Sequence, residues 1–157
     1  MATSNAATSY LENRLLSFIF KNNAASFSSP GDSIYVGLAT AVSNFNDSTG
    51  ESGTPAITEA TFGDYGRKQV TAANWTLTAD TANQQTITNA ANIDFDASTG
   101  TNNTITHVFI TTAASASLDT LGSGGNVLFI GALDASKTIA TGDIFRINAG
   151  NLTIELK

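Results

Sequence analysis

The residues best suited to chemistry in this sequence are a single histidine and two closely spaced aspartates. His107 is the one histidine and the chain has no cysteine, which excludes paired-histidine metal sites, zinc fingers and thiol nucleophiles. A serine hydrolase needs its serine on a strained G-x-S-x-G turn, and the sequence contains no such stretch. His107 shares a predicted strand face with Ile105 and Phe109, so we interpret it as a structural histidine.

Asp94 and Asp96 begin a segment, residues 94–100, with oxygen-bearing side chains at alternate positions, as in a calcium loop. Its glycine falls one position late, and Ile105 stands where a bidentate glutamate is required. The two aspartates could also form a glycosidase pair, but nothing in the sequence marks a sugar cleft. The favoured interpretation is an ordinary turn at a strand end. We therefore expect no enzymatic activity, no metal and no cofactor.

Composition and charge narrow the possible partners. The 157 residues carry a net charge of −6, and 13% of them are charged. Nucleic acids and anionic membranes are bound through lysine and arginine, so neither is an expected partner. Arg67, Lys68 and Arg146 are interpreted as solvated or edge-protecting cations on strands. No apolar run is long enough to span a membrane, and the start of the chain lacks the pattern of a secretory signal.

One amphipathic helix is predicted over residues 10–22, after an N-terminal arm formed by residues 1–9. Ser9 and Glu12 have the spacing of a capping box. The apolar stripe of this helix consists of Leu11, Leu15, Phe18 and Ile19, widened by Leu16 and Phe20. A helix of about 12 residues is unstable alone, so we expect it to dock onto another surface.

From residue 33 onward, apolar residues alternate with a period of two, as in β-strands. About eight to ten short strands are expected, a number typical of sandwiches and jelly rolls. Residues 40–63 are predicted to form a long loop, and Trp75, Leu77 and Ala79 to point inward from a strand. The predicted fold class is all-β: one β-sandwich or jelly-roll-like domain over residues 10–157, with one short N-terminal α-helix.

Two features of the sequence predict association with other subunits. The run 127–133 is apolar on both faces, so we expect the core on one side and the N-terminal helix or a neighbouring subunit on the other. The arm is small and polar, and has no means of ordering itself. The predicted interface comprises Met1, Ala2, Thr3, Ser4, Asn5, Leu16, Phe20, Leu128 and Ile130.

Several blocks, taken in order, resemble a widespread family of small tailed-bacteriophage virion proteins whose members are often labelled tail fibre protein. Similar small β proteins serve as capsid decoration, or cement, proteins. The blocks that carry the resemblance lie at residues 10–16, 35–40, 65–70, 106–110, 125–133 and 149–154.

The resemblance implies a phage structural protein without catalytic residues. We expect a capsid decoration protein, made in the host cytoplasm, that sits on the virion surface as a homotrimer and bridges major capsid protein subunits. The alternative is a tail fibre or receptor-binding-associated tail protein. Such a protein would bind a host glycan through loops 40–63 and 96–103, with stacking from Phe45, Phe62, Tyr65 and Trp75.

Overall fold

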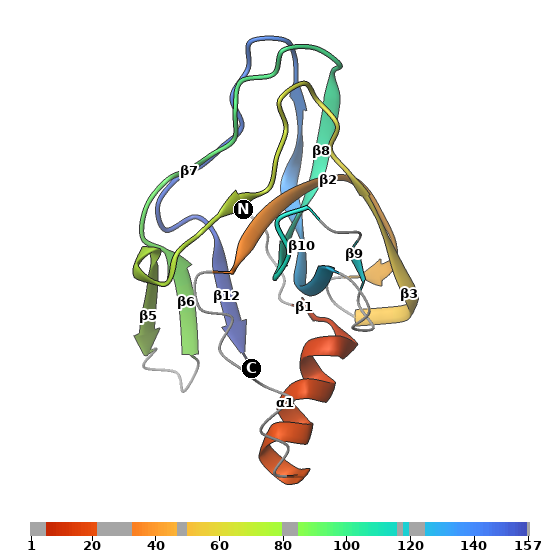
Figure 1. Ribbon diagram of the computed structural model, residues 1–157, viewed down its shortest axis with the longest axis vertical. Helices are drawn as coiled ribbons and strands as arrows, with labels where there is room; N and C mark the ends of the chain where they lie inside the picture. The colour runs from red at the N-terminus through yellow and green to blue at the C-terminus, as the bar shows by residue number, and fades with distance from the viewer. Residues whose placement is uncertain are drawn as a thin grey trace.

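The computed structural model describes residues 6–21, 33–46, 50–79, 85–115, 118–119 and 125–156. Within these residues the chain is mostly antiparallel β-structure with one α-helix, α1 (Ser9–Lys21). The predicted all-β class with a short N-terminal helix is therefore confirmed. Figure 1 shows α1 extending from one end of the β-structure, beyond the strands that form the body of the molecule.

The largest sheet has the strand order β1-β10-β8-β2-β3, with β4 pairing with β2 and β9 pairing with β10. All of these pairs are antiparallel except that between β9 and β10. Its strands are β1 (Ala6–Ala7), β2 (Tyr35–Asn46), β3 (Gly50–Glu59), β4 (Lys68–Gln69), β8 (Asn103–Thr111), β9 (Leu118–Asp119) and β10 (Gly125–Ile139).

Two smaller sheets lie beside the large one (Figure 1). The first has the order β12-β6-β5 and the second pairs β11 with β7. Their strands are β5 (Trp75–Ala79), β6 (Gln85–Asn89), β7 (Ile93–Asp94), β11 (Arg146–Ile147) and β12 (Thr153–Leu156), and the short 3-10 helix η2 (Ala72–Asn74) precedes β5.

The main core lies between the large sheet and the segments that carry the smaller ones. Four aromatic rings run through it. The Tyr65 ring stacks on Phe95 at a centroid distance of 5.9 Å, while Phe62 and Phe145 each meet a neighbouring ring edge to face. Such ring pairs stabilise a core beyond the area that they bury. This packing joins residues from distant parts of the chain into one unit.

A second, smaller core covers the other face of the large sheet. It is formed by Ala39, Phe109, Val127 and Ile130, with Val42, Phe45, Ile57 and Leu118 packed against it. The predicted burial of both faces of run 127–133 agrees with this arrangement. On this second face, residues of the β2–β3 hairpin and β9 pack against the core. A register shift between Val127 and Phe129 turns successive residues of β10 toward different cores.

The prediction of a long loop over residues 40–63 is wrong, because β2 and β3 form an extended hairpin there. The register between these strands shifts between Ala39 and Ala41 and again between Ser43 and Phe45. Asn44 lies within the second irregularity and has a φ of 57°. Bulges of this kind interrupt the two-residue alternation on which strand prediction depends.

The expected inward orientation of β5 is also wrong in part. Trp75 is half-buried and packs against the main core, but Leu77 is 69% exposed. The main core reaches only the beginning of this strand, and the three-stranded sheet continues past it (Figure 1). Among the described residues, no helix is long and apolar enough to cross a membrane.

Gly37 provides a test of the close packing between β2 and β8. A Cβ atom built on Gly37 would lie 2.6 and 2.7 Å from Cε2 and Cε1 of Phe109. Overpacking of this kind typically costs about 1–3 kcal/mol. We therefore expect Gly37→Ala to lower the free energy of unfolding by that amount in a denaturant titration. Gly66→Ala is the control, because nothing lies within 4 Å of its added Cβ; equal effects of the two substitutions would contradict the packing.

Candidate functional site

Helix α1 is attached to the sheet through Thr8, whose side chain is completely buried. The Thr8 amide donates to the carbonyl oxygen of Leu128 at 3.0 Å, and the Thr8 hydroxyl donates to that of Val127 at 2.6 Å. The same hydroxyl oxygen accepts from the Leu11 amide at 3.4 Å. Thr8 therefore caps the helix and ties its first turn to β10 at the same time.

This arrangement corrects two predictions about the N-terminus. The capping residue is Thr8, since Ser9 already lies within α1. Residues 1–9 are also not wholly an arm, because Ala6 and Ala7 form β1 and pair with Ile130 and Phe129. A short strand at the sheet edge thus leads directly into the helix, and fixes where the helix begins.

Past its first turn, α1 carries large apolar side chains on its surface. Leu16 is 56% exposed, Ile19 57% and Phe20 77%, and Leu15 and Phe18 are also exposed. Apolar residues are often found singly on protein surfaces, but several on one short helix form a continuous patch, which usually marks an interaction site. The expected docking of the helix thus does not cover these side chains within one chain. We call Leu15, Leu16, Phe18, Ile19 and Phe20 the α1 apolar face.

The predicted interface residues fall into three groups. Met1, Ala2, Thr3, Ser4 and Asn5 lie outside the described residues. Leu16 and Phe20 are on the α1 apolar face. Leu128 is half-buried against the main core, and Ile130 is 1% exposed within the second core. The side chain of Ile130 therefore lies inside the chain and offers no surface to a partner.

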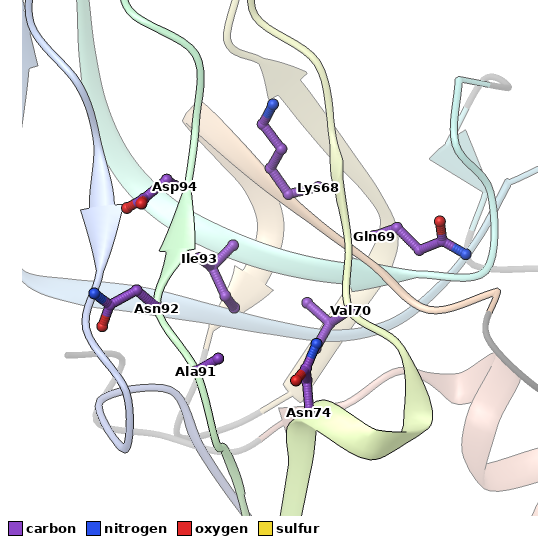
Figure 2. A pocket seen from close by; sticks show the side chains of 8 residues that line it. All are labelled: Lys68, Gln69, Val70, Asn74, Ala91, Asn92, Ile93 and Asp94. Atoms are coloured by element: carbon purple, nitrogen blue, oxygen red, sulfur yellow. The ribbon is translucent and has the colours of Figure 1, made fainter.

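A small polar pocket lies between β4, η2 and β7 (Figure 2). Its volume is about 210 Å³, below the range of roughly 300–1,000 Å³ typical of ligand pockets. It is lined by Lys68, Gln69, Val70, Asn74, Ala91, Asn92, Ile93 and Asp94. A pocket of this size and polarity has room for little more than a small polar group.

The charged groups around this pocket are already paired within the chain. Lys68 Nζ lies 2.6 Å from Asp96 Oδ2, and Arg146 makes two hydrogen bonds to Asp94, of 2.5 and 2.9 Å. The hydrogen bond from Arg146 lowers the pKa of the Asp94 carboxyl below its usual value. Asp94 and Asp96 therefore each face a cation, which is the arrangement of surface ion pairs. Among the described residues, no group of three or more metal-ligating side chains is found.

His107 and the aromatic residues of the predicted glycan site have structural surroundings. His107 Nδ1 lies 2.8 Å from the hydroxyl of its neighbour Thr106 on β8. Phe62 is 1% exposed, and Tyr65 and Trp75 pack against the same main core. Phe45 packs against the second core. The predicted stacking of sugars on these four rings is therefore not supported by their positions.

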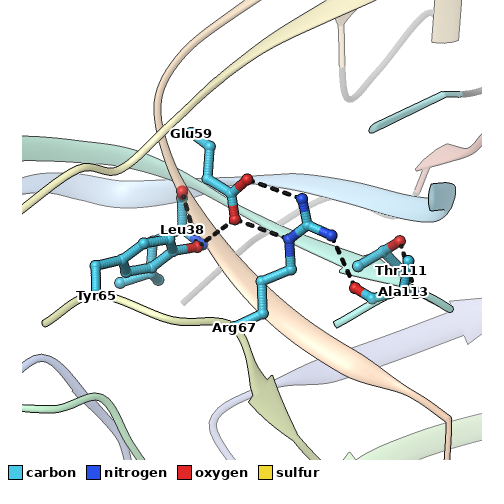
Figure 3. Close-up of polar contacts among 6 residues, drawn as sticks. All are labelled: Leu38, Glu59, Tyr65, Arg67, Thr111 and Ala113. Atoms are coloured by element: carbon cyan, nitrogen blue, oxygen red, sulfur yellow. Dashed lines mark hydrogen bonds and ion pairs between the residues drawn. The ribbon is translucent and has the colours of Figure 1, made fainter. Parts of the chain in front are cut away.

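A largely buried ion pair joins Arg67 and Glu59 (Figure 3). Arg67 Nε and Nη2 donate to the two carboxylate oxygens of Glu59, each at 2.8 Å. Arg67 Nη1 donates to the carbonyl oxygen of Ala113 at 2.8 Å. The Arg67 side chain is 4% exposed, so the prediction that it is a solvated or edge-protecting cation is wrong. Its parallel hydrogen bonds have the two-pronged geometry typical of arginine–carboxylate pairs.

Tyr65 extends this ion pair into the sheet (Figure 3). Its hydroxyl donates to Glu59 Oε1 at 2.8 Å and accepts from the Leu38 amide at 2.9 Å. Burial raises the pKa of the Tyr65 phenol well above its ordinary value, and the negative charge of Glu59 acts in the same direction. The Arg67 guanidinium also lies 5.6 Å from the centre of the Phe109 ring, within the range of a cation–π interaction. The network therefore joins β2, β3 and β8 to the segment before β4.

A comparison with known families now adds to this geometry. Residues 6–155 match the family described as Podophage GP4 fiber I protein gp80. The chain belongs to this family. It is therefore a phage virion structural protein, as the resemblance in its sequence implies. No curated protein matches the chain.

The match to the fiber I family spans all of the described residues except Leu156. It begins at Ala6, the first residue of β1, and so takes in Thr8 and the whole of α1. The attached helix and its apolar face are consequently part of the family region, together with the β-domain.

The buried ion pair gives a direct test of what holds this region together. Arg67→Met removes the guanidinium and leaves the Glu59 carboxylate without its cation. Loss of one partner from a buried pair costs about 3–5 kcal/mol, so we expect a fall of that size in the free energy of unfolding measured with urea.

Arg146→Met is the matched control, because its pair with Asp94 has side chains that are 51% and 46% exposed. Exposed pairs contribute little to stability, and the control is expected to unfold close to wild type. If Arg67→Met unfolds at the same urea concentration as the control, the buried pair is not a main support of the fold.

Proposed function

We propose that the protein is a structural subunit of a virion fibre, with no enzymatic activity of its own. The observation that carries this proposal is the family match over residues 6–155, whose description is that of a fibre protein. It favours the tail fibre or receptor-binding-associated role over capsid decoration, and it gives no specific support to the major capsid protein as the partner. The proposed location is therefore the fibre rather than the capsid surface.

The side chains that could do chemistry support a structural role. Asp94 and Asp96 are held by Arg146 and Lys68, and Glu59 is held by Arg67 and Tyr65. A general acid or base needs a carboxyl group that is available to a substrate. Each of these three carboxylates instead serves to join strands or loops of the same chain.

The proposed mechanism is mechanical. A load on α1 passes to β10 through the β1 pairing and the two hydrogen bonds that Thr8 donates. Strand β10 runs through the large sheet beside β8 and contributes to both cores. The attachment point is thus connected to the most extensively packed part of the domain, as a subunit that holds an assembly together requires.

The location of the protein in purified virions tests this proposal. We expect gold-labelled antibodies against the chain to mark fibres. We also expect its gel band, scaled to that of the major capsid protein, to correspond to a few or a few tens of copies per particle. Labelling spread evenly over the capsid, with hundreds of copies, would contradict the fibre and support capsid decoration instead.

A further inference from the structure

The polar pocket between β4, η2 and β7 has an apolar base. Val70 and Ile93 line it, and both side chains are buried in the main core. Figure 2 shows the Ile93 side chain extending toward Val70 across the space between the two walls. The pocket therefore combines a base that belongs to the packed interior with a rim of polar side chains.

The rim offers hydrogen-bonding groups of both kinds. Asn74 and Asn92 each bring a carboxamide, Lys68 an ammonium group and Asp94 a carboxylate. The Asn74 side-chain oxygen and the Asn92 side-chain nitrogen have no partner among the described residues. A ligand in the pocket therefore meets one acceptor and one donor that the protein itself does not use.

Hydrogen bonds to the surrounding loops hold both walls in place. The Asn74 carbonyl oxygen accepts from the Ala90 amide at 2.7 Å, and the Asn74 side-chain nitrogen donates to Thr71 Oγ1 at 3.2 Å. On the opposite wall, Asn92 Oδ1 accepts from the Ala149 amide at 2.9 Å. The walls are thus ordered before a ligand arrives, which lowers the entropic cost of binding.

The second wall is also anchored from behind by Asn89, which is buried. Its side-chain nitrogen donates to the carbonyl oxygens of Ala91 and Asn148 at 2.7 and 2.9 Å, and its side-chain oxygen accepts from the Leu152 amide at 2.9 Å. Ala91 itself lines the pocket. This satisfied buried amide fixes the position of the wall relative to the loop after β11.

The charges around the pocket cancel. Lys68 is paired with Asp96, and Asp94 with Arg146, so each cation at or beside the rim has its anion. A charged ligand gains no net attraction from this set, and has to compete with an ion pair to reach a counter-charge. The electrostatics of the pocket therefore favour a ligand without net charge.

The volume and the lining together define the chemical class of the ligand. A volume of about 210 Å³ corresponds to roughly seven water molecules at ~30 Å³ each, which is room for one small ring. The apolar base matches a ring face of C–H groups. Hydroxyl groups around the ring edge both donate and accept, as the mixed rim requires. A neutral pyranose sugar combines these properties.

We propose that this pocket binds one neutral pyranose ring at the end of a saccharide chain. The C–H face of the ring packs on Val70 and Ile93, and its hydroxyl groups bond to Asn74, Asn92 and Lys68. Because only one ring fits, the next sugar of the chain lies outside the pocket. The proposal adds a ligand to the proposed structural role and does not rest on it, since binding is measured on the chain alone.

A nuclear magnetic resonance titration of the full-length chain tests binding directly. The probes are the methyl α-D-pyranosides of glucose, galactose and mannose. We expect at least one of them to shift the side-chain amide signals of Asn74 and Asn92, with a dissociation constant in the millimolar range that a ligand of this size allows. Absence of these shifts with all of the glycosides would overturn the proposal.

Two further probes test the ring and the chain end. Sorbitol carries hydroxyl groups without a ring and should bind about 10-fold more weakly or less, because it presents no C–H face to the apolar base. Equal binding of sorbitol would overturn the recognition of a ring. A disaccharide that ends in the binding sugar should bind as tightly as the single ring, and its exclusion would overturn the assignment to a chain end.

Substitutions place the ligand in the pocket. Asn74→Leu removes the unused acceptor at similar size, and we expect about 10-fold weaker binding with an unchanged urea midpoint, because Asn74 is exposed. Lys68→Met keeps the aliphatic stem, removes the ammonium donor and should also weaken binding. Asn102→Leu is the matched control, an exposed asparagine that does not line the pocket, and should bind as wild type does.

Binding that is unchanged in both Asn74→Leu and Lys68→Met would place the sugar elsewhere and overturn the proposal. An equal loss in Asn102→Leu would do the same, because it would show that the effect is not specific to the pocket. None of these results would change where antibodies label the virion. Failure of this inference can therefore be told apart from failure of the proposed fibre role.

Discussion

The attachment of Thr8 to β10 is the contact on which the arrangement of the helix depends. One buried residue donates two hydrogen bonds to the strand and accepts a third from the helix. Because both the backbone and the side chain of Thr8 take part, the first turn cannot swing back over the sheet without breaking them. The direction of α1 is thereby set, and with it the exposure of the α1 apolar face.

This exposure has a considerable free-energy consequence. Full burial of a Leu, Ile or Phe side chain stabilises by about 1.5–3 kcal/mol, so covering these partly exposed side chains corresponds to several kcal/mol before the entropic cost of association. That is comparable with the whole net stability of a small domain, about 5–15 kcal/mol. A chain that leaves so much apolar area in water gains stability from a partner that covers it.

The β-domain is held together by a different kind of contact. The Glu59–Arg67 pair and Tyr65 join three strands of the large sheet near Leu38 and Ala39, adjacent residues of β2 that belong to the main core and the second core respectively. Buried charges are tolerated when their hydrogen-bonding groups are satisfied, and Arg67 meets this condition with Glu59 and the Ala113 carbonyl. This network stabilises the large sheet, to which α1 is attached through Thr8.

Local patterns predicted the parts of this fold that depend on neighbouring residues. Helix α1 follows from its apolar spacing, and its observed bounds lie close to the predicted residues 10–22. Strand β8 contains Ile105, His107 and Phe109, which were predicted to lie in a strand. The β2–β3 hairpin was hidden by its bulges, which break the alternation at Ala39 and Ser43. The burial of Arg67 was not predictable, because it requires Phe109 and Ala113, more than forty residues away, to lie beside it. The width of the apolar stripe indicated that Leu16 and Phe20 could be exposed. Their position away from the core, however, depends on the attachment of Thr8 to β10.

The most direct test of the account is a cryo-electron microscopy reconstruction of the fibre in the intact virion. The account predicts that the β-domain of this chain lies in the fibre, with Leu16, Ile19 and Phe20 of α1 covered by a neighbouring subunit. A chain that lies on the capsid surface, or an α1 helix whose apolar side chains face solvent in the assembled fibre, would contradict it.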